Sequence, residues 1–114
     1  MKVHAHEPAP LLVDTMQFAT WLDGRFGADS RVLARSLCQR VLVLLDAVVL
    51  ALKDRDRDER LAAADEALVC LRVQLRLAAT CGLISDAQTI HALGFADRIG
   101  RQLGGWIRQR SEIA

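Results

Sequence analysis

The chain has 114 residues, of which 52% are hydrophobic, and this suits one domain built around a single core. Fifteen Lys and Arg residues are balanced by fourteen Asp and Glu residues, so the net charge of +1 indicates no overall attraction to nucleic acid or to a membrane. The odd number of cysteines, three, favours reduced thiols over a disulfide framework. We therefore expect a cytoplasmic protein.

Helix-forming residues dominate, and both prolines lie within the first ten residues. We expect residues 1–10 to form a disordered or loosely attached tail, followed by a four-helix domain over residues 11–112. The first predicted helix, residues 11–26, has apolar residues three and four apart, which places them on one helix face: Leu12, Met16, Ala19, Leu22 and Phe26.

The second predicted helix, residues 30–53, begins after Asp29 or Ser30, either of which can accept the free amides of a first turn. Its segment Val41–Leu52 is apolar nearly all round, interrupted by Asp46, and at twelve residues it is too short to cross a bilayer. A helix in an isolated bundle needs a single apolar stripe. The surplus apolar surface predicts self-association.

The alternating charges of Asp54–Arg60 indicate a solvated reversal of the chain. Asp56 and Glu59 form a capping-box pattern, which predicts the start of a third helix over residues 57–81. That helix is expected to end at Gly82, because glycine adopts a left-handed cap at little cost.

The fourth predicted helix covers residues 86–110, and Ser85 with Gln88 supplies its capping box. The loops between the long helices are short enough to require antiparallel neighbours. The predicted fold is therefore all-α, an antiparallel up-down-up-down four-helix bundle that assembles into a homo-oligomer.

Glycine inside a helix costs about 1 kcal/mol relative to alanine, so the glycines of the fourth helix predict that another helix packs close to its backbone. Their spacing gives two lanes, of which one can face a neighbouring helix and the other a neighbouring subunit, although such lanes also occur wholly inside single subunits. The residues expected in helix or subunit packing are Val41, Leu44, Val48, Gly94, Gly100, Gly104, Gly105 and Trp106.

Folding the third helix onto the fourth about Gly82 brings Asp65 level with Arg101 and Arg72 within about one turn of Asp97. Such pairs would fix the register between the two helices and add little stability, because desolvation offsets most of the attraction.

Arginine supplies nearly all of the positive charge and recurs along the second and fourth helices. Arginine at helical intervals can hold phosphates, although a solvated helix face explains the same pattern. The residues that would contact nucleic acid are Arg31, Arg35, Arg40, Arg101 and Arg108.

No pattern in the sequence predicts an enzyme. The triplet Asp54, Asp56 and Asp58 resembles half of a calcium loop but lacks glycine at the sixth position. His91 has no Cys or Asp at triad spacing, and a hydrolase using it is the weakest of three interpretations. We expect no catalytic residue, no metal and no cofactor.

The segments Ala62–Ala78 and Ile99–Ile107 resemble the four-helix-bundle family that contains Avd, the accessory variability determinant of diversity-generating retroelements. They are also similar to the proteins encoded in intervening sequences of bacterial ribosomal RNA genes. The positions that carry the resemblance are Leu71, Arg72, Leu75, Arg76, Gly100, Arg101, Leu103, Gly104, Trp106 and Ile107.

The resemblance implies a homopentamer, a barrel of five bundles around a channel, and for Avd itself binding to nucleic acid and to a reverse transcriptase. The first interpretation is a non-enzymatic cytoplasmic homo-oligomer that serves as an assembly or interaction protein and does not bind membranes. The alternative is an Avd-like nucleic-acid-binding accessory protein of a reverse transcriptase.

Overall fold

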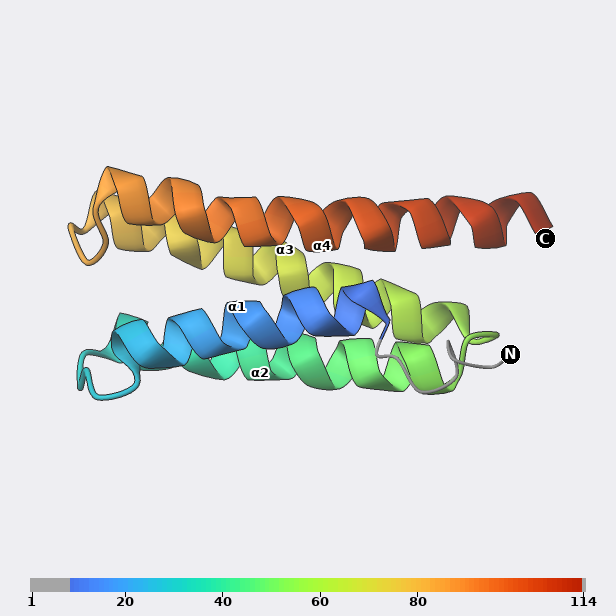
Figure 1. Ribbon diagram of the computed structural model, residues 1–114, viewed down its shortest axis with the longest axis horizontal. Coiled ribbons are helices and arrows are strands. Elements are labelled where there is room, and N and C mark those ends of the chain that lie inside the picture. The colour runs from blue at the N-terminus through green and yellow to red at the C-terminus, as the bar shows by residue number, and fades with distance from the viewer. Residues whose placement is uncertain (1–8, 114) are drawn as a thin grey trace.

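A computed structural model describes residues 9–113 and contains four helices, α1 (Pro10–Phe26), α2 (Val32–Lys53), α3 (Asp58–Thr80) and α4 (Asp86–Ile113) (Figure 1). No strand occurs in this range. The prediction of an all-α chain with four helices is therefore confirmed.

The helices begin and end close to the expected positions, and the largest difference is at the C-terminal end. There α4 continues to Ile113, past the expected end at Arg110. The expected N-terminal tail falls mainly on residues 1–8, which lie outside the described residues, whereas Pro10 is already the first residue of α1. Proline suits that position because the first turn of a helix does not need its amide.

The loop between α1 and α2 is closed by Asp29, whose carboxylate accepts hydrogen bonds from the Arg31 amide at 2.9 Å and from the Arg31 Nε at 3.0 Å. These hydrogen bonds from Arg31 lower the pKa of Asp29 to about 2. Asp29 thus binds the amide of Arg31, the residue that precedes α2, but no side chain caps the first turn of the helix, so the cap expected from Asp29 or Ser30 was wrong. A salt bridge to Asp29 occupies the Arg31 side chain.

The two predicted capping boxes have different outcomes. Glu59 pairs with Arg57, with 2.9 Å between Nη2 and Oε2, and no side chain caps α3, so the box expected from Asp56 was wrong. Arg57 lies closer to Glu59 than Asp56 does along the chain and offers a full opposite charge. At α4 the reciprocal box forms, with Ser85 and Gln88 joined by hydrogen bonds of 2.9 and 3.1 Å.

Gly82 has a φ of +76°, the left-handed conformation expected at the end of α3. Figure 1 shows the α1–α2 and α3–α4 loops at one end of the bundle and the α2–α3 loop at the other. Both α1 and α3 pack against α2 and α4, which places the helices at the corners of a square in chain order.

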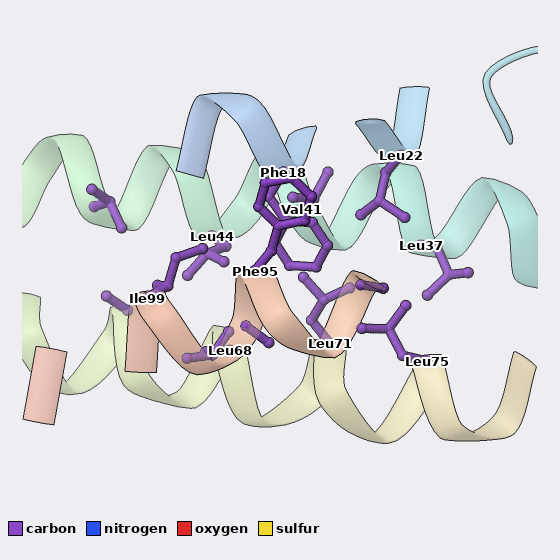
Figure 2. Packing of buried hydrophobic residues seen from close by; sticks show 14 of the residues in the cluster. Phe18, Leu22, Leu37, Val41, Leu44, Leu68, Leu71, Leu75, Phe95 and Ile99 are labelled. Carbon is purple, nitrogen blue, oxygen red and sulfur yellow. The ribbon is translucent and has the colours of Figure 1, made fainter. Parts of the chain in front are cut away.

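The core lies between the four helices and is almost entirely aliphatic (Figure 2). Its central contact joins α1 to α4, where the rings of Phe18 and Phe95 stack with 5.2 Å between their centroids. Each helix contributes residues spaced three and four apart, as an amphipathic helix must. The largest fully buried side chains include Phe18, Leu22, Leu37, Val41, Leu44, Val48, Leu71, Leu75, Ile99 and Leu103.

None of the helices within residues 9–113 combines the length and the apolar character that crossing a membrane requires.

Candidate interaction surfaces on α2, α3 and α4

The residues of α2 that we expected in packing, Val41, Leu44 and Val48, are all buried inside the bundle. They hold α2 against its own chain and are not accessible to another copy. The residues that remain accessible follow directly after them in the sequence, at Leu42 and Val49 among others. The three residues expected in helix or subunit packing thus pack within the bundle, and the accessible members of the same apolar run were not predicted.

One outward side of α2 carries an apolar surface, which we call the α2 face. Leu42 is 54% exposed and Val49 is 45% exposed, although both are large aliphatic side chains. Helical spacing of three, four and seven residues places them on one side with Asp46. The α2 face consists of Leu42, Val43, Asp46, Val49 and Leu50, all exposed.

Among the glycines of α4, only Gly100 is approached by another helix of the bundle. A Cβ atom there would lie 2.8 Å from Nη2 of Arg72 and 3.4 Å from Cδ2 of Leu68, both on α3. Gly94 has no atom within 4 Å of such a Cβ position, and the only atoms near Gly104 and Gly105 belong to Arg108 on the same helix. The close approach expected at these three glycines is therefore not made within the subunit.

The charged pairs expected between α3 and α4 also differ from each other. Arg72 and Asp97 form an ion pair, with 2.8 Å between Nη1 and Oδ1, and Arg72 Nη2 donates to the Ala96 carbonyl oxygen at 3.0 Å. Asp65 and Arg101 line the same groove but do not form an ion pair in the structure. Asp65 and Arg101 were expected to pair because they lie at the same level along the two helices. Equal level does not make the side chains meet, because Arg101 lies on the outward side of α4 and is exposed.

A shallow groove of about 510 Å³ runs between α3 and α4, and we call it the α3–α4 groove. Gly100 and Gly104 lie along it, and Val69, 53% exposed, provides an apolar wall. Its lining carries one more positive than negative side chain, since three arginines stand against the two carboxylates of Asp65 and Asp97. The lining residues are Asp65, Leu68, Val69, Arg72, Asp97, Gly100, Arg101, Gly104 and Arg108.

The arginines expected to contact nucleic acid do not form one surface. Arg31 is paired with Asp29 at the α1–α2 loop. Arg35 and Arg40 line a separate hollow on α2. Two further arginines, Arg101 and Arg108, line the α3–α4 groove, so the five side chains are divided among three places.

An aromatic cluster on the α1–α4 side was not predicted. His91 lies against Trp21, with 5.1 Å between ring centroids, and meets Phe95 edge-on at the same distance. Trp106, expected in packing, is partly buried against the core and is covered by the Arg55 guanidinium at 5.5 Å. The i, i+3 spacing of Phe18 and Trp21 and the i, i+4 spacing of His91 and Phe95 are the signals that could have indicated the cluster.

Polar links at the helix ends were also missed. Asp14 of α1 accepts a hydrogen bond from Gln102 of α4 at 2.7 Å. Arg110 Nε donates to Asp58 at 2.9 Å, which connects the end of α4 to the start of α3. These contacts join residues 88 and 52 positions apart, and no local pattern in the sequence reveals such a pairing.

Within the described residues, no group of three or more His, Cys, Asp or Glu side chains is arranged to hold a metal ion. In the acidic reversal, Asp58 is bound by Arg110 and Asp54 faces Arg60, so arginine already neutralises these carboxylates. Burial raises the pKa of the Cys38 thiol, whose sulfur lies 3.7 Å from the Leu22 carbonyl oxygen. The partly buried position favours the protonated thiol.

The fold and these surfaces describe a small four-helix-bundle protein whose accessible features are an apolar helix face and a groove lined by arginine. A family model described as bAvd-like matches residues 16–110. The chain therefore belongs to the bAvd-like family, which confirms the Avd-like resemblance. No match tests the similarity to the ribosomal RNA intervening-sequence proteins. Neither the curated proteins nor the solved structures contain a match.

The contact between Arg72 and Gly100 leads to a prediction about stability. Replacing a helical glycine by alanine stabilises by about 1 kcal/mol where space allows. We expect Gly94→Ala to give this gain, whereas Gly100→Ala should give clearly less, because the added Cβ displaces the Arg72 guanidinium from Ala96 and Asp97. In an Arg72→Met background, Gly100→Ala should recover the full gain.

Urea unfolding of the four variants measures these differences as a double-mutant cycle. Equal gains from Gly94→Ala and Gly100→Ala in the wild-type background would show that Arg72 is not held against Gly100.

Proposed function

We propose that this protein is a non-enzymatic, cytoplasmic assembly protein in which five copies of an antiparallel up-down-up-down bundle form a ring. The ring would act as an accessory module that presents a multivalent surface to a partner. Membership of the bAvd-like family supports this proposal, because the Avd resemblance implies a pentamer.

The observation that carries the proposal is the exposed apolar surface of α2. Residues on the inner side of α2 supply its part of the bundle core. On the outer side, the exposed fractions remain between 37% and 54% for Leu42, Val43, Val49 and Leu50. Completing the burial of four such side chains contributes about 1 kcal/mol each, by proportion to the value for a fully buried aliphatic side chain. Closing a ring multiplies this contribution, since each copy then has two contacts and dissociates only when both are lost.

Multi-angle light scattering after size-exclusion chromatography tests the assembly. We expect one species of about five times the 12.6 kDa mass of a single chain. Replacing Leu42 and Val49 by glutamate should give a smaller species of unchanged helical content, because these side chains are exposed within the subunit. A wild-type protein that remains at the mass of one chain at high concentration would overturn the proposal.

A second candidate function is an Avd-like accessory protein that binds nucleic acid for a reverse transcriptase. The specific observation in its favour is the hollow on α2, where Arg35 and Arg40 are both exposed beside Ser36 and Gln39. Neither arginine forms an ion pair within residues 9–113. Val43 of the α2 face also lines this hollow, so a ring would repeat the two arginines beside each subunit contact and multiply a weak attraction to phosphates.

Filter binding of a structured RNA over a range of salt concentrations tests this second function. We expect retention at low salt that falls linearly in a double-logarithmic plot, and a shallower slope, by about one unit per lost phosphate contact, for Arg35→Gln and Arg40→Gln. Arg25→Gln, a change at an exposed arginine of α1, is the matched control. Absence of retention at low salt, or equal slopes for all three variants, would exclude the hollow as a nucleic-acid site.

A further inference from the structure

We infer that the α2 face of one copy docks into the α3–α4 groove of the next copy, where Asp46 meets Arg101 and Arg108. This inference rests on the proposed assembly and names the two surfaces that form it. The partner of each surface is a second copy of this chain.

A closed ring of more than two copies needs two different surfaces on every subunit, because each contact joins one surface to the other. The α2 face and the α3–α4 groove meet this requirement. They belong to different sides of the bundle, since α2 packs against α1 and α3 but not against α4. One copy can therefore use both surfaces at the same time.

The groove can receive a helix because little stands above the backbone of α4 there. A Cβ atom at Gly104 would meet no atom of another helix within 4 Å, and the nearest atom is Nη1 of Arg108 on the same helix, 3.6 Å away. Val69, 53% exposed, is an apolar part of the groove wall on α3, and Val73, 61% exposed, follows on that helix beyond the lining. These two valines are four residues apart and so lie one above the other.

Charge distinguishes this pairing from a purely apolar one. Asp46 is exposed in the middle of the α2 face and forms no ion pair within the described part of the chain. Arg101 and Arg108 are two helical turns apart on one side of α4, and neither forms an ion pair in that part. Asp65 also lines the groove, but the two arginines outnumber this carboxylate, and an acidic group at the centre of the apolar face matches the remaining positive charge.

Two other surfaces that the α2 face could contact fit less well. Symmetric pairing of two α2 faces about Asp46 would bring two carboxylates together and leave the arginines of the groove uncovered. The apolar hollow on the α1–α4 side, lined by Met16 and Trp21, offers no free positive charge for Asp46. Arg98 lies over the ring of Phe95, one of the lining residues, and is 3.8 Å from Asp14.

Charge reversal tests the pairing, measured as the protein concentration at which the assembly dissociates in sedimentation velocity. Asp46→Arg and Arg101→Asp should each raise this concentration by at least about 100-fold, because each places like charges opposite one another. The double variant should return to within about tenfold of the wild type. Mixing the two single variants should restore association in part, since each supplies the surface that complements the other, although a closed ring of five copies keeps at least one mismatched contact.

Circular dichroism should show unchanged helix content in all variants, because both residues are exposed in the subunit. The control Arg25→Asp reverses an exposed charge on α1 and should leave the dissociation concentration unchanged. Arg108→Asp should weaken the assembly in the same direction as Arg101→Asp.

Several results would overturn this docking while leaving the assembly itself intact. A wild-type oligomer that tolerates both single reversals would exclude the pairing. Disruption by Asp46→Arg but not by Arg101→Asp would indicate that α2 faces pair with each other. Loss of RNA retention by Arg101→Asp without any change in mass would assign the groove to nucleic acid. A wild-type protein that is a single chain would instead refute the proposed function from which this inference starts.

Discussion

A four-helix bundle can cover only the inward side of each helix, and α2 is apolar on its inward and outward sides alike. The inward side of α2 packs in the core through Val41, Leu44 and Val48. Because successive residues of a helix lie on different sides, their neighbours in the sequence cannot also face the core. No rotation of α2 about its axis would bury all of these side chains, because any rotation that buries Leu42 exposes a residue that is now in the core. The excess of apolar surface on α2 is thus a consequence of the sequence and of helix geometry.

Two glycines of α4, Gly100 and Gly104, leave space above the helix backbone, and the two spaces differ in what fills them. At Gly100 the missing side chain provides space for Arg72, which crosses from α3 and binds Asp97 and the Ala96 carbonyl oxygen. One turn later, at Gly104, no other helix of the chain uses the space. Each of these two glycines lowers the stability of the helix. A contact inside the subunit explains Gly100, whereas Gly104 lies in an open groove.

Periodicity and capping chemistry predicted most of the fold. Apolar spacing located the four helices. The left-handed Gly82 and the Ser85 and Gln88 capping box located the loop between α3 and α4. These signals are reliable because each depends only on neighbours within four residues. The Asp56 box failed for the same local reason, since Arg57 offered Glu59 a stronger partner. At the interaction surfaces, spacing indicated the level of a residue but not its side of the helix. Of the two ion pairs predicted from level alone, Arg72 and Asp97 form one, whereas Asp65 and Arg101 do not. The long-range hydrogen bond between Asp14 and Gln102 had no signal in the sequence.

Another copy of the chain must cover the outward side of α2 if this account is correct, and assembly must then contribute to the stability of the fold. The midpoint of thermal unfolding, measured over a hundredfold range of protein concentration, tests this most directly, because association that stabilises only the folded state makes the midpoint depend on concentration. We expect the midpoint to rise steadily with concentration. A midpoint that is the same at every concentration would contradict the account.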